Sequence, residues 1–332
     1  MKLRHSIMLG MIGGITDRFH HYQPSRDLAE RLAMVKQVRG VDGIEIVYPS
    51  DFGNVQETVA MVKDTGLPVS AVNLNVKSQD KWRQGSFTAP SAALRAEAVA
   101  DMKTAMDLAV EFGSDMITCC PLIDGHNYNF QVDYMQQWQW LEAGIAEAAR
   151  HRDDVRISLE YKLNESRNYC ILGDMGRTLF LCERLGFPHV GVTMDVGHAL
   201  IAKETPAEVL TIAAQASPRR SGDSSDAAGR LFYVHFNDNA REWDWDMLPG
   251  SVNVWDLVEM IYYLDRLNWN GWLSYDVATR NGDQIEQMSA SIAIVETAIQ
   301  LLDKLGRDTL QGLIEEGIPA NAYTYLYQSL MR

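Results

Sequence analysis

The sequence predicts an α/β fold that consists of a single (β/α)8 (TIM) barrel with a C-terminal helical extension. Three observations support this prediction: the length of 332 residues, the apolar fraction of 46%, and eight short β-rich runs that alternate with longer helical patterns. A chain of this length can bury one large core. A doubly wound sheet is the alternative, but eight β-then-α units favour a closed barrel, and no Gly-x-Gly-x-x-Gly fingerprint follows the first strand.

The predicted strands are short, apolar and rich in β-branched or aromatic residues, as the buried strands of a parallel sheet are. In chain order they span residues 6–12, 43–49, 68–76, 115–121, 155–162, 189–196, 231–238 and 271–278. Helices are predicted over residues 27–39, 91–113, 133–150 and 254–267, where apolar residues recur every three or four positions. We therefore expect the barrel to occupy residues 1–305.

Two segments lie outside this alternation. Residues 217–230 are polar and rich in Gly and Ser, which predicts a loop on the helix-side or bottom face before the seventh strand. Residues 306–332 carry Tyr323, Tyr325 and Tyr327 among aliphatic residues. We expect this extension to pack on the barrel or on a neighbouring subunit, and the protein to form a homodimer or homotetramer.

The overall charge and the cysteines restrict the partners and the compartment. The formal net charge of −14 argues against nucleic acid or an anionic membrane surface as a partner and favours a small neutral ligand, here a sugar. Residues 1–14 predict a barrel strand instead of a signal peptide, and no run reaches the roughly 18 apolar residues of a membrane-spanning helix. Four cysteines without Cys-x-x-Cys spacing favour the reducing cytoplasm, and Cys119 and Cys120 are expected to pack in the barrel.

Polar residues end four consecutive predicted strands, the fifth to the eighth. They are Glu160, Asp195, His235 and Asp276, each one βα unit after the last. In a (β/α)8 barrel such residues converge at the C-terminal ends of the strands. Three carboxylates and an imidazole would repel one another and lose hydration unless a cation lies between them. Oxygen-rich ligation with one imidazole suits Mn²⁺, Mg²⁺ or Co²⁺. The alternative is that each residue caps a loop or forms an internal ion pair.

A second set of candidates follows the same strands. His198 lies three residues after Asp195, and Asp244 and Asp246 form an Asp-x-Asp pair in the loop after the seventh strand. Together these side chains can hold a second, more hydrated metal ion. The alternative for the Asp-x-Asp pair is a solvated acidic loop.

Lys162 shares a strand face with Glu160, so it is a candidate donor to a developing oxyanion or to a substrate hydroxyl. A structural salt bridge is the alternative role for this lysine. In the first half of the chain, Glu45, Asn73 and Asn75 occupy strand positions that can face the mouth and bind substrate hydroxyls.

The motifs in residues 155–280 together resemble the xylose-isomerase-like barrels, and within them rhamnose isomerase and related metal-dependent aldose-ketose isomerases. The matching motifs are Glu160-Tyr-Lys162, Asp195-Val-Gly-His198, His235-Phe-Asn-Asp238, Asp244-Trp-Asp246 with Gly250-Ser251, and Asp276. This chain differs from the rhamnose isomerase pattern by one extra residue between the histidine and the Asp-x-Asp pair and by its shorter length.

The resemblance implies an aldose-ketose isomerase that uses Mn²⁺, or Mg²⁺ or Co²⁺, with one or two ions per subunit. It assigns Glu160, Asp195, His235 and Asp276 to one metal, and His198, Asp244 and Asp246 to a second. Lys162, His198 and Asp276 are expected to be catalytic. Because the chain is shorter than those enzymes, the substrate can be a tetrose, a pentose, apiose or a deoxy sugar.

Other activities on the same barrel are a ketose 3-epimerase, an inosose-type dehydratase and a C-glycoside-cleaving lyase subunit that needs a partner chain. Epimerases and dehydratases usually have glutamate on the eighth strand, so Asp276 and the acidic pair favour the isomerase. A metal-dependent endonuclease would need a basic groove, which the net charge opposes. A non-catalytic binding protein is the remaining alternative.

Overall fold

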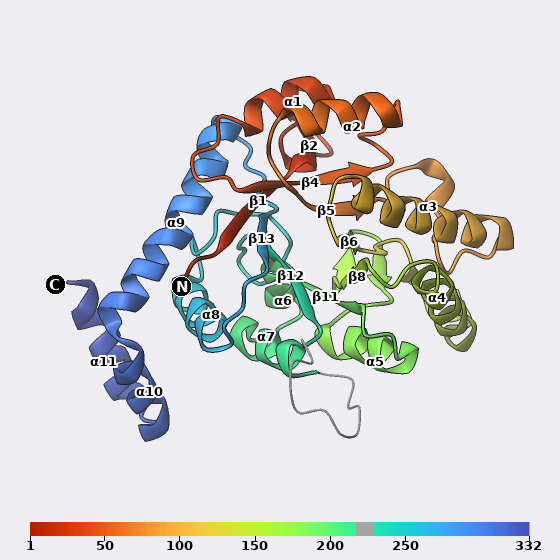
Figure 1. Ribbon diagram of the computed structural model, residues 1–332. Helices are drawn as coiled ribbons and strands as arrows, with labels where there is room; N and C mark the ends of the chain where they lie inside the picture. The colour runs from red at the N-terminus through yellow and green to blue at the C-terminus, as the bar shows by residue number, and fades with distance from the viewer. Residues whose placement is uncertain (217–228, 332) are drawn as a thin grey trace.

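The computed structural model describes residues 1–216 and 229–331 and has a closed barrel of eight parallel strands at its centre (Figure 1). The strands are β1 (Arg4–Met8), β4 (Gly43–Tyr48), β5 (Val69–Leu74), β6 (Met116–Cys119), β8 (Arg156–Glu160), β11 (Val190–Asp195), β12 (Leu231–Phe236) and β13 (Trp272–Tyr275). They pair in the order β1-β13-β12-β11-β8-β6-β5-β4, and β4 closes on β1. The predicted barrel and its eight strands are confirmed. Residues 217–228 of the predicted loop lie outside the described residues.

The first strand is shorter than predicted. β1 ends at Met8, and a 3-10 helix, η1 (Leu9–Met11), follows it. Leu9 and Ile12 are both fully buried. Their spacing of three fits one turn of a 3-10 helix, whereas a strand would turn the two side chains to opposite faces.

Helices surround the barrel and connect its strands. They are α1 (Leu28–Val35), α2 (Val55–Asp64), α3 (Ala92–Glu111), α4 (Tyr134–Ala149), α5 (Met175–Leu185), α7 (Pro206–Gln215), α8 (Val254–Arg266) and α9 (Gln284–Leu305). Asp27, Ser91, Asp133 and Asp174 begin α1, α3, α4 and α5 by accepting a hydrogen bond from a first-turn backbone N–H. Within the described residues no helix is long and apolar enough to cross a membrane.

The C-terminal extension consists of α10 (Arg307–Glu316) and α11 (Pro319–Leu330), which lie beyond the end of α9 (Figure 1). The Tyr325 hydroxyl donates a hydrogen bond to the Leu305 carbonyl at 2.6 Å, and Tyr327 packs edge-on against Trp255. No residue of α10 is buried. The extension also contacts the barrel helices through the Arg307–Asp265 ion pair and the hydrogen bond from the Tyr262 hydroxyl to Gln311, and its role in a homo-oligomer stays a prediction.

Short elements shape the C-terminal end of the barrel. β2 (Ile15–Thr16) pairs with β3 (His21–Gln23), and η2 (Asp80–Trp82) follows β5. β7 (Gly125–His126), β10 (Asn168–Cys170) and β9 (Asn164–Glu165) form a small antiparallel sheet. This sheet joins the loop after β6 to the loop after β8. The helix α6 (Val196–Ile201) follows β11 directly and is buried throughout.

Candidate metal centre

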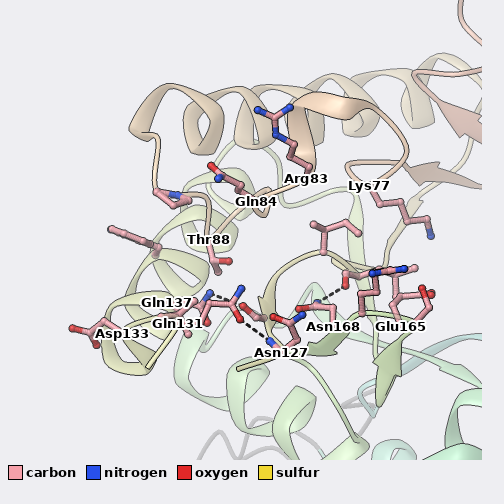
Figure 2. A pocket seen from close by; sticks show the side chains of 18 of the residues that line it. Lys77, Arg83, Gln84, Thr88, Asn127, Gln131, Asp133, Gln137, Glu165 and Asn168 are labelled. Carbon is pink, nitrogen blue, oxygen red and sulfur yellow. Dashed lines mark hydrogen bonds between the residues drawn. The ribbon is translucent and has the colours of Figure 1, made fainter. Parts of the chain in front are cut away.

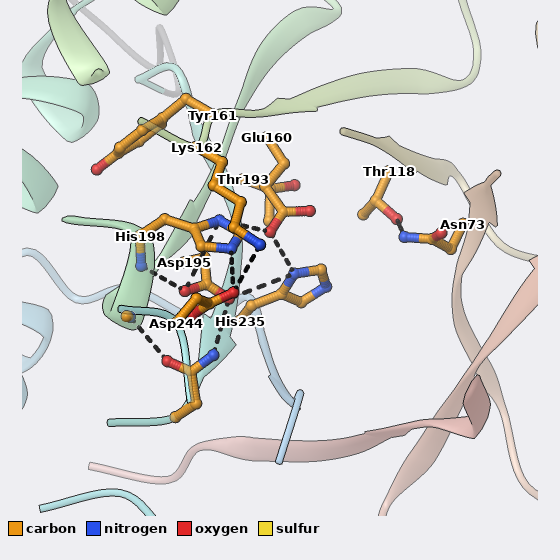
Figure 3. Close-up of polar contacts among 12 residues, drawn as sticks. Asn73, Thr118, Glu160, Tyr161, Lys162, Thr193, Asp195, His198, His235 and Asp244 are labelled. Carbon is orange, nitrogen blue, oxygen red and sulfur yellow. Dashed lines mark hydrogen bonds and ion pairs between the residues drawn. The ribbon is translucent and has the colours of Figure 1, made fainter. Parts of the chain in front are cut away.

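The register of three neighbouring strands places the first group of candidate ligands. Asp195 lies opposite His235, and Glu160 lies opposite Thr193, two residues before Asp195. Side chains alternate with a period of two, so this stagger keeps the three candidates on the inner face of the barrel. Their ligand atoms all lie within 4.8 Å of one another (Figure 3). His235 Nδ1 lies 3.2 Å from Glu160 Oε1 and 4.0 Å from Asp195 Oδ2.

His198 reaches this group because α6 begins directly at the end of β11. Asp195 is the N-cap residue, and its Oδ1 accepts a hydrogen bond from the His198 N–H at 2.8 Å. The His198 ring then lies between two acids, with Nδ1 3.1 Å from Glu160 Oε1 and Nε2 3.2 Å from Asp244 Oδ2. A Cβ at Gly197 would lie 2.6 Å from Asn237 Oδ1, so only glycine allows α6 to pack this closely against the Asn237 side chain.

The loop after β12 carries the Asp-x-Asp pair over the mouth. Asp238 holds the loop closed, because its carboxylate accepts hydrogen bonds from the backbone N–H groups of Val252 and Asn253 at 2.8 and 3.0 Å. The Asp246 carbonyl accepts a hydrogen bond from the Ala278 N–H at 2.9 Å, which ties the pair to the segment after β13. The loop therefore has a defined path in which both aspartates face the ends of the strands.

Asp276 and Asp246 lie outside the three groups of described residues whose ligand atoms fall within 4.8 Å of one another, although both interact with the charge of Asp244. Among the described residues, neither carboxylate forms a hydrogen bond or an ion pair. Burial raises the pKa of both groups, and the neighbouring Asp244 adds to the shift. Burial also raises the pKa of Asp195, to about 7. Crowded carboxylates without a cation are disfavoured in their charged form.

Lys162 forms ion pairs with two acids. Its Nζ lies 2.8 Å from Asp244 Oδ2 and 2.6 Å from Glu165 Oε1. The salt bridge that was the alternative role for this lysine is thus present, and one of its acids, Asp244, is a candidate ligand. Although burial lowers it, the pKa of Lys162 is raised overall by Asp244 and Glu165, so the ammonium stays charged.

The donor set fits a divalent cation. Of the buried side-chain atoms without a hydrogen-bond partner among the described residues, three belong to this centre: His198 Nδ1, His235 Nδ1 and Asp244 Oδ1. Burial lowers the pKa of both histidines, but the surrounding carboxylates outweigh it and raise both values well above the usual range. Protons therefore balance the carboxylate charge in this arrangement, and a cation ligated by the same atoms would replace them.

The prediction that Glu45 and Asn73 face the mouth is wrong. Both are buried inside the barrel, with exposed fractions of 0% and 5%, and they hydrogen-bond to other barrel side chains. Glu45 accepts hydrogen bonds from His235 Nε2 at 3.0 Å and from the hydroxyls of Thr118 and Ser274, both at 2.6 Å. Since Nε2 donates to Glu45, Nδ1 of His235 is left as the ligand atom.

Asn75, the third of these candidates, shapes a turn. Its side-chain oxygen accepts hydrogen bonds from the backbone N–H groups of Lys77 and Ser78, and its amide donates to the Ser78 hydroxyl at 2.7 Å.

Sequence reasoning missed two residues near the centre. The Cys120 thiol, directly after β6, lies within 4.8 Å of the ligand atoms of Glu160 and His198. Burial raises its pKa well above the usual value, so the thiol is protonated. Lys77, from the loop after β5, lies close enough to interact with the charge of Glu160. The position of Cys120 at the end of a predicted strand could have indicated that it lies near the centre. The sequence does not show where the loop that carries Lys77 runs.

Comparisons with known proteins agree with this architecture. Residues 32–305 match the family model described as a xylose isomerase-like TIM barrel. The xylose isomerase of Thermus thermophilus is 26% identical over 228 residues, which cover 67% of this chain and 56% of that protein. The xylose isomerase of Thermus caldophilus is 25% identical over the same shares. The chain thus spans little more than half the length of the curated relatives it matches.

Solved structures with the same fold include two sugar epimerases. An L-ribulose 3-epimerase superimposes with a TM-score of 0.66 at 18% identity, covering 90% of this chain and 96% of that one. The 3-keto-D-glucoside 4-epimerase of E. coli gives a TM-score of 0.65 at 18% identity, covering 89% and 100%. At these identities the likeness shows the fold alone.

Proposed function

This chain belongs to the xylose isomerase-like TIM-barrel family, and from that premise we propose that it is a divalent-metal-dependent sugar isomerase that interconverts an aldose and its ketose. One observation carries the proposal: His198 lies between Glu160 and Asp244 and so joins two groups of acids into one centre. A second acidic group beside the first is what distinguishes an isomerase of this kind from a single-metal epimerase.

The proposed ligands divide into two sets. Glu160, Asp195, His235 and Asp276 hold one ion, and His198, Asp244 and Asp246 hold a second. Carboxylate oxygens with imidazole nitrogens suit Mn²⁺, Mg²⁺ or Co²⁺. When bound, such an ion supplies Lewis-acid polarisation of a substrate oxygen.

The side chains of this chain supply positioning and proton transfer. The Lys162 ammonium, fixed between Asp244 and Glu165, is oriented to donate to a substrate oxygen on which negative charge develops. Asp276, which has no hydrogen-bond partner among the described residues, accepts and returns the proton that moves between C1 and C2 if the reaction passes through an enediol. His198 orients the second acidic group through its contact with Asp244.

The test is a ¹³C NMR time course on purified protein with Mn²⁺ or with a chelator. The panel holds tetroses, pentoses, apiose and deoxyhexoses. The expected result is Mn²⁺-dependent formation of a ketose from one aldose. Asp246→Asn is expected to remove this activity, while Glu242→Gln, at an exposed position in the same loop, is the matched control.

Two results would contradict the proposal. Conversion of a ketose into its epimer would favour the epimerase. Metal binding with every free sugar unchanged would favour the lyase subunit that needs a partner chain.

We also propose that the enzyme acts in the cytoplasm as a homodimer or homotetramer, supported by the exposed Tyr323, Tyr327 and Leu330 of α11. Light scattering on the purified protein and on a chain ending at residue 305 tests the assembly. A monomeric full-length chain would contradict it.

A further inference from the structure

We propose that a cavity beside the metal centre binds an anionic group of the substrate, so that the substrate is a sugar carrying a carboxylate, phosphate or sulfonate at the end remote from its reacting carbons. This inference rests on the proposed isomerase function and names the substrate class of the same site.

The cavity has a volume of about 810 Å³ and lies between the loops that follow β5, β6 and β8 (Figure 2). That volume lies within the range of roughly 300–1,000 Å³ that is usual for small-molecule sites. None of the proposed metal ligands lines this cavity, so it offers space for a substituent beyond the part of the sugar that lies at the metal centre.

Buried hydrogen bonds fix the walls of the cavity. The Asp124 carboxylate accepts hydrogen bonds from the backbone N–H groups of Ser86 and Thr88 at 2.9 and 2.7 Å and from both of their hydroxyls. The Asn168 amide donates to the Leu122 carbonyl at 2.8 Å. These contacts join all three loops. The cavity is therefore preformed, and binding does not have to order its walls.

The acidic side chains that line the cavity have partners within the chain, whereas its basic side chains form no hydrogen bond or ion pair with another described residue. Its two acids already have partners: Glu165 pairs with Lys162 at 2.6 Å, and Asp133 caps α4. Three cations also line it, namely Lys77, Arg83 and Arg167. None of their side chains forms a hydrogen bond or ion pair with another described residue. In a chain with a net charge of −14, a cavity lined by three cations that form no ion pair, of which Lys77 is partly buried and Arg83 and Arg167 are exposed, favours an anion.

The cavity lies beside the metal centre, and two of the residues that line it reach towards the proposed ligands. Glu165 lines it and contacts Lys162, whose Nζ lies 2.8 Å from Asp244 Oδ2. Lys77 lines it as well and interacts with the charges of Glu160 and Asp276. One molecule can thus place its reacting carbons at the metal ligands and an oxyanion beside Lys77. The expectation of a neutral sugar came from the charge of the whole chain, and the local charge of this cavity has the opposite sign.

The activity test compares matched pairs of sugars on the Mn²⁺-loaded enzyme. The pairs are glucose with glucuronate, arabinose with arabinose 5-phosphate, and glucose with 6-deoxy-6-sulfoglucose. We expect kcat/KM to be at least tenfold higher for the anionic member of one pair, and Lys77→Met or Arg167→Gln to reduce that ratio at least tenfold. Lys63→Met removes an exposed lysine paired with Glu111 on the outer helices and serves as the control. A neutral preference in every pair, or an unchanged ratio in both variants, would overturn the inference.

A binding test separates this inference from the isomerase proposal. Calorimetric titration of metal-free protein with gluconate, and separately with sulfate, is expected to show saturable binding that weakens at least tenfold in Lys77→Met. If this binding is found but no sugar is isomerised, the anion site stands and the isomerase proposal fails. If sugars are isomerised but neither anion binds, the anion site fails and the isomerase proposal stands.

Discussion

Replacement of Glu45 by glutamine tests how the buried interior of the barrel supports the metal centre. Glu45 is fully buried and accepts a hydrogen bond from His235 Nε2 at 3.0 Å. Burial would raise the pKa of Glu45, but His235, Ser274 and Thr118 hold it below the usual value, so the side chain is a carboxylate. Glutamine keeps the shape but loses the negative charge and one of the two acceptor oxygens, so His235 Nε2 is left with a neutral carbonyl acceptor that it shares with the Thr118 and Ser274 hydroxyls.

The expected cost is a 10- to 100-fold loss of Mn²⁺ affinity. A hydrogen bond to a charged group contributes about 1.5–3 kcal/mol. Loss of the partner that orients a metal-ligating histidine usually costs roughly 10- to 100-fold in affinity, which corresponds to about 1.4–2.8 kcal/mol. The two ranges agree, because the same contact both orients the ring and selects the tautomer that leaves Nδ1 free.

Competition with a fluorescent chelator measures this affinity in wild type, Glu45→Gln and the control Glu296→Gln. Glu296 also contacts a histidine nitrogen, His5 Nε2, at 2.7 Å, and among the described residues neither Glu296 nor His5 forms a hydrogen bond or ion pair with a proposed metal ligand. The control is therefore expected to bind Mn²⁺ as wild type does. If Glu45→Gln, folded as judged by its thermal midpoint, bound Mn²⁺ within twofold of wild type, the proposed role of Nδ1 of His235 would be refuted.

Three further outcomes are expected. Asp195→Asn removes detectable turnover in the NMR assay and weakens Mn²⁺ binding, whereas retained turnover would exclude Asp195 as a ligand. Asp124→Ala leaves four buried donors without an acceptor, so urea denaturation is expected to show that the free energy of unfolding falls by at least about 3 kcal/mol. The control Asp133→Ala removes a helix cap and should lower it by about 1 kcal/mol. Equal losses in the two variants would contradict the structural role given to Asp124. Mn²⁺ at one hundred times its dissociation constant is expected to raise the free energy of unfolding by about 2.7 kcal/mol, and a thermal midpoint that chelator leaves unchanged would contradict a bound metal.

Local patterns were sufficient to predict the barrel. Strand-forming runs and helical periods depend on neighbouring residues, so the seven barrel strands after β1 were placed correctly from residue type alone, whereas the short strands β7, β9 and β10 in the loops were not predicted. The exception was β1, where a run of apolar residues contains both a strand and the turn η1. Apolar character alone does not distinguish a period of two from a period of three over so few residues.

The sequence by itself determined which polar residues end the strands: Glu160, Asp195, His235 and Asp276 are recognisable because each directly follows an apolar run. Only the tertiary structure decided what they contact. Strand tilt and stagger set the depth of each side chain, which placed Glu45 beneath His235 instead of at the mouth. The path of the loop after β5 brought Lys77 towards the centre, and the path of the loop after β12 brought Asp244 to His198. Those paths depend on contacts between residues far apart in the chain, such as those of Asp124, and no local pattern encodes them.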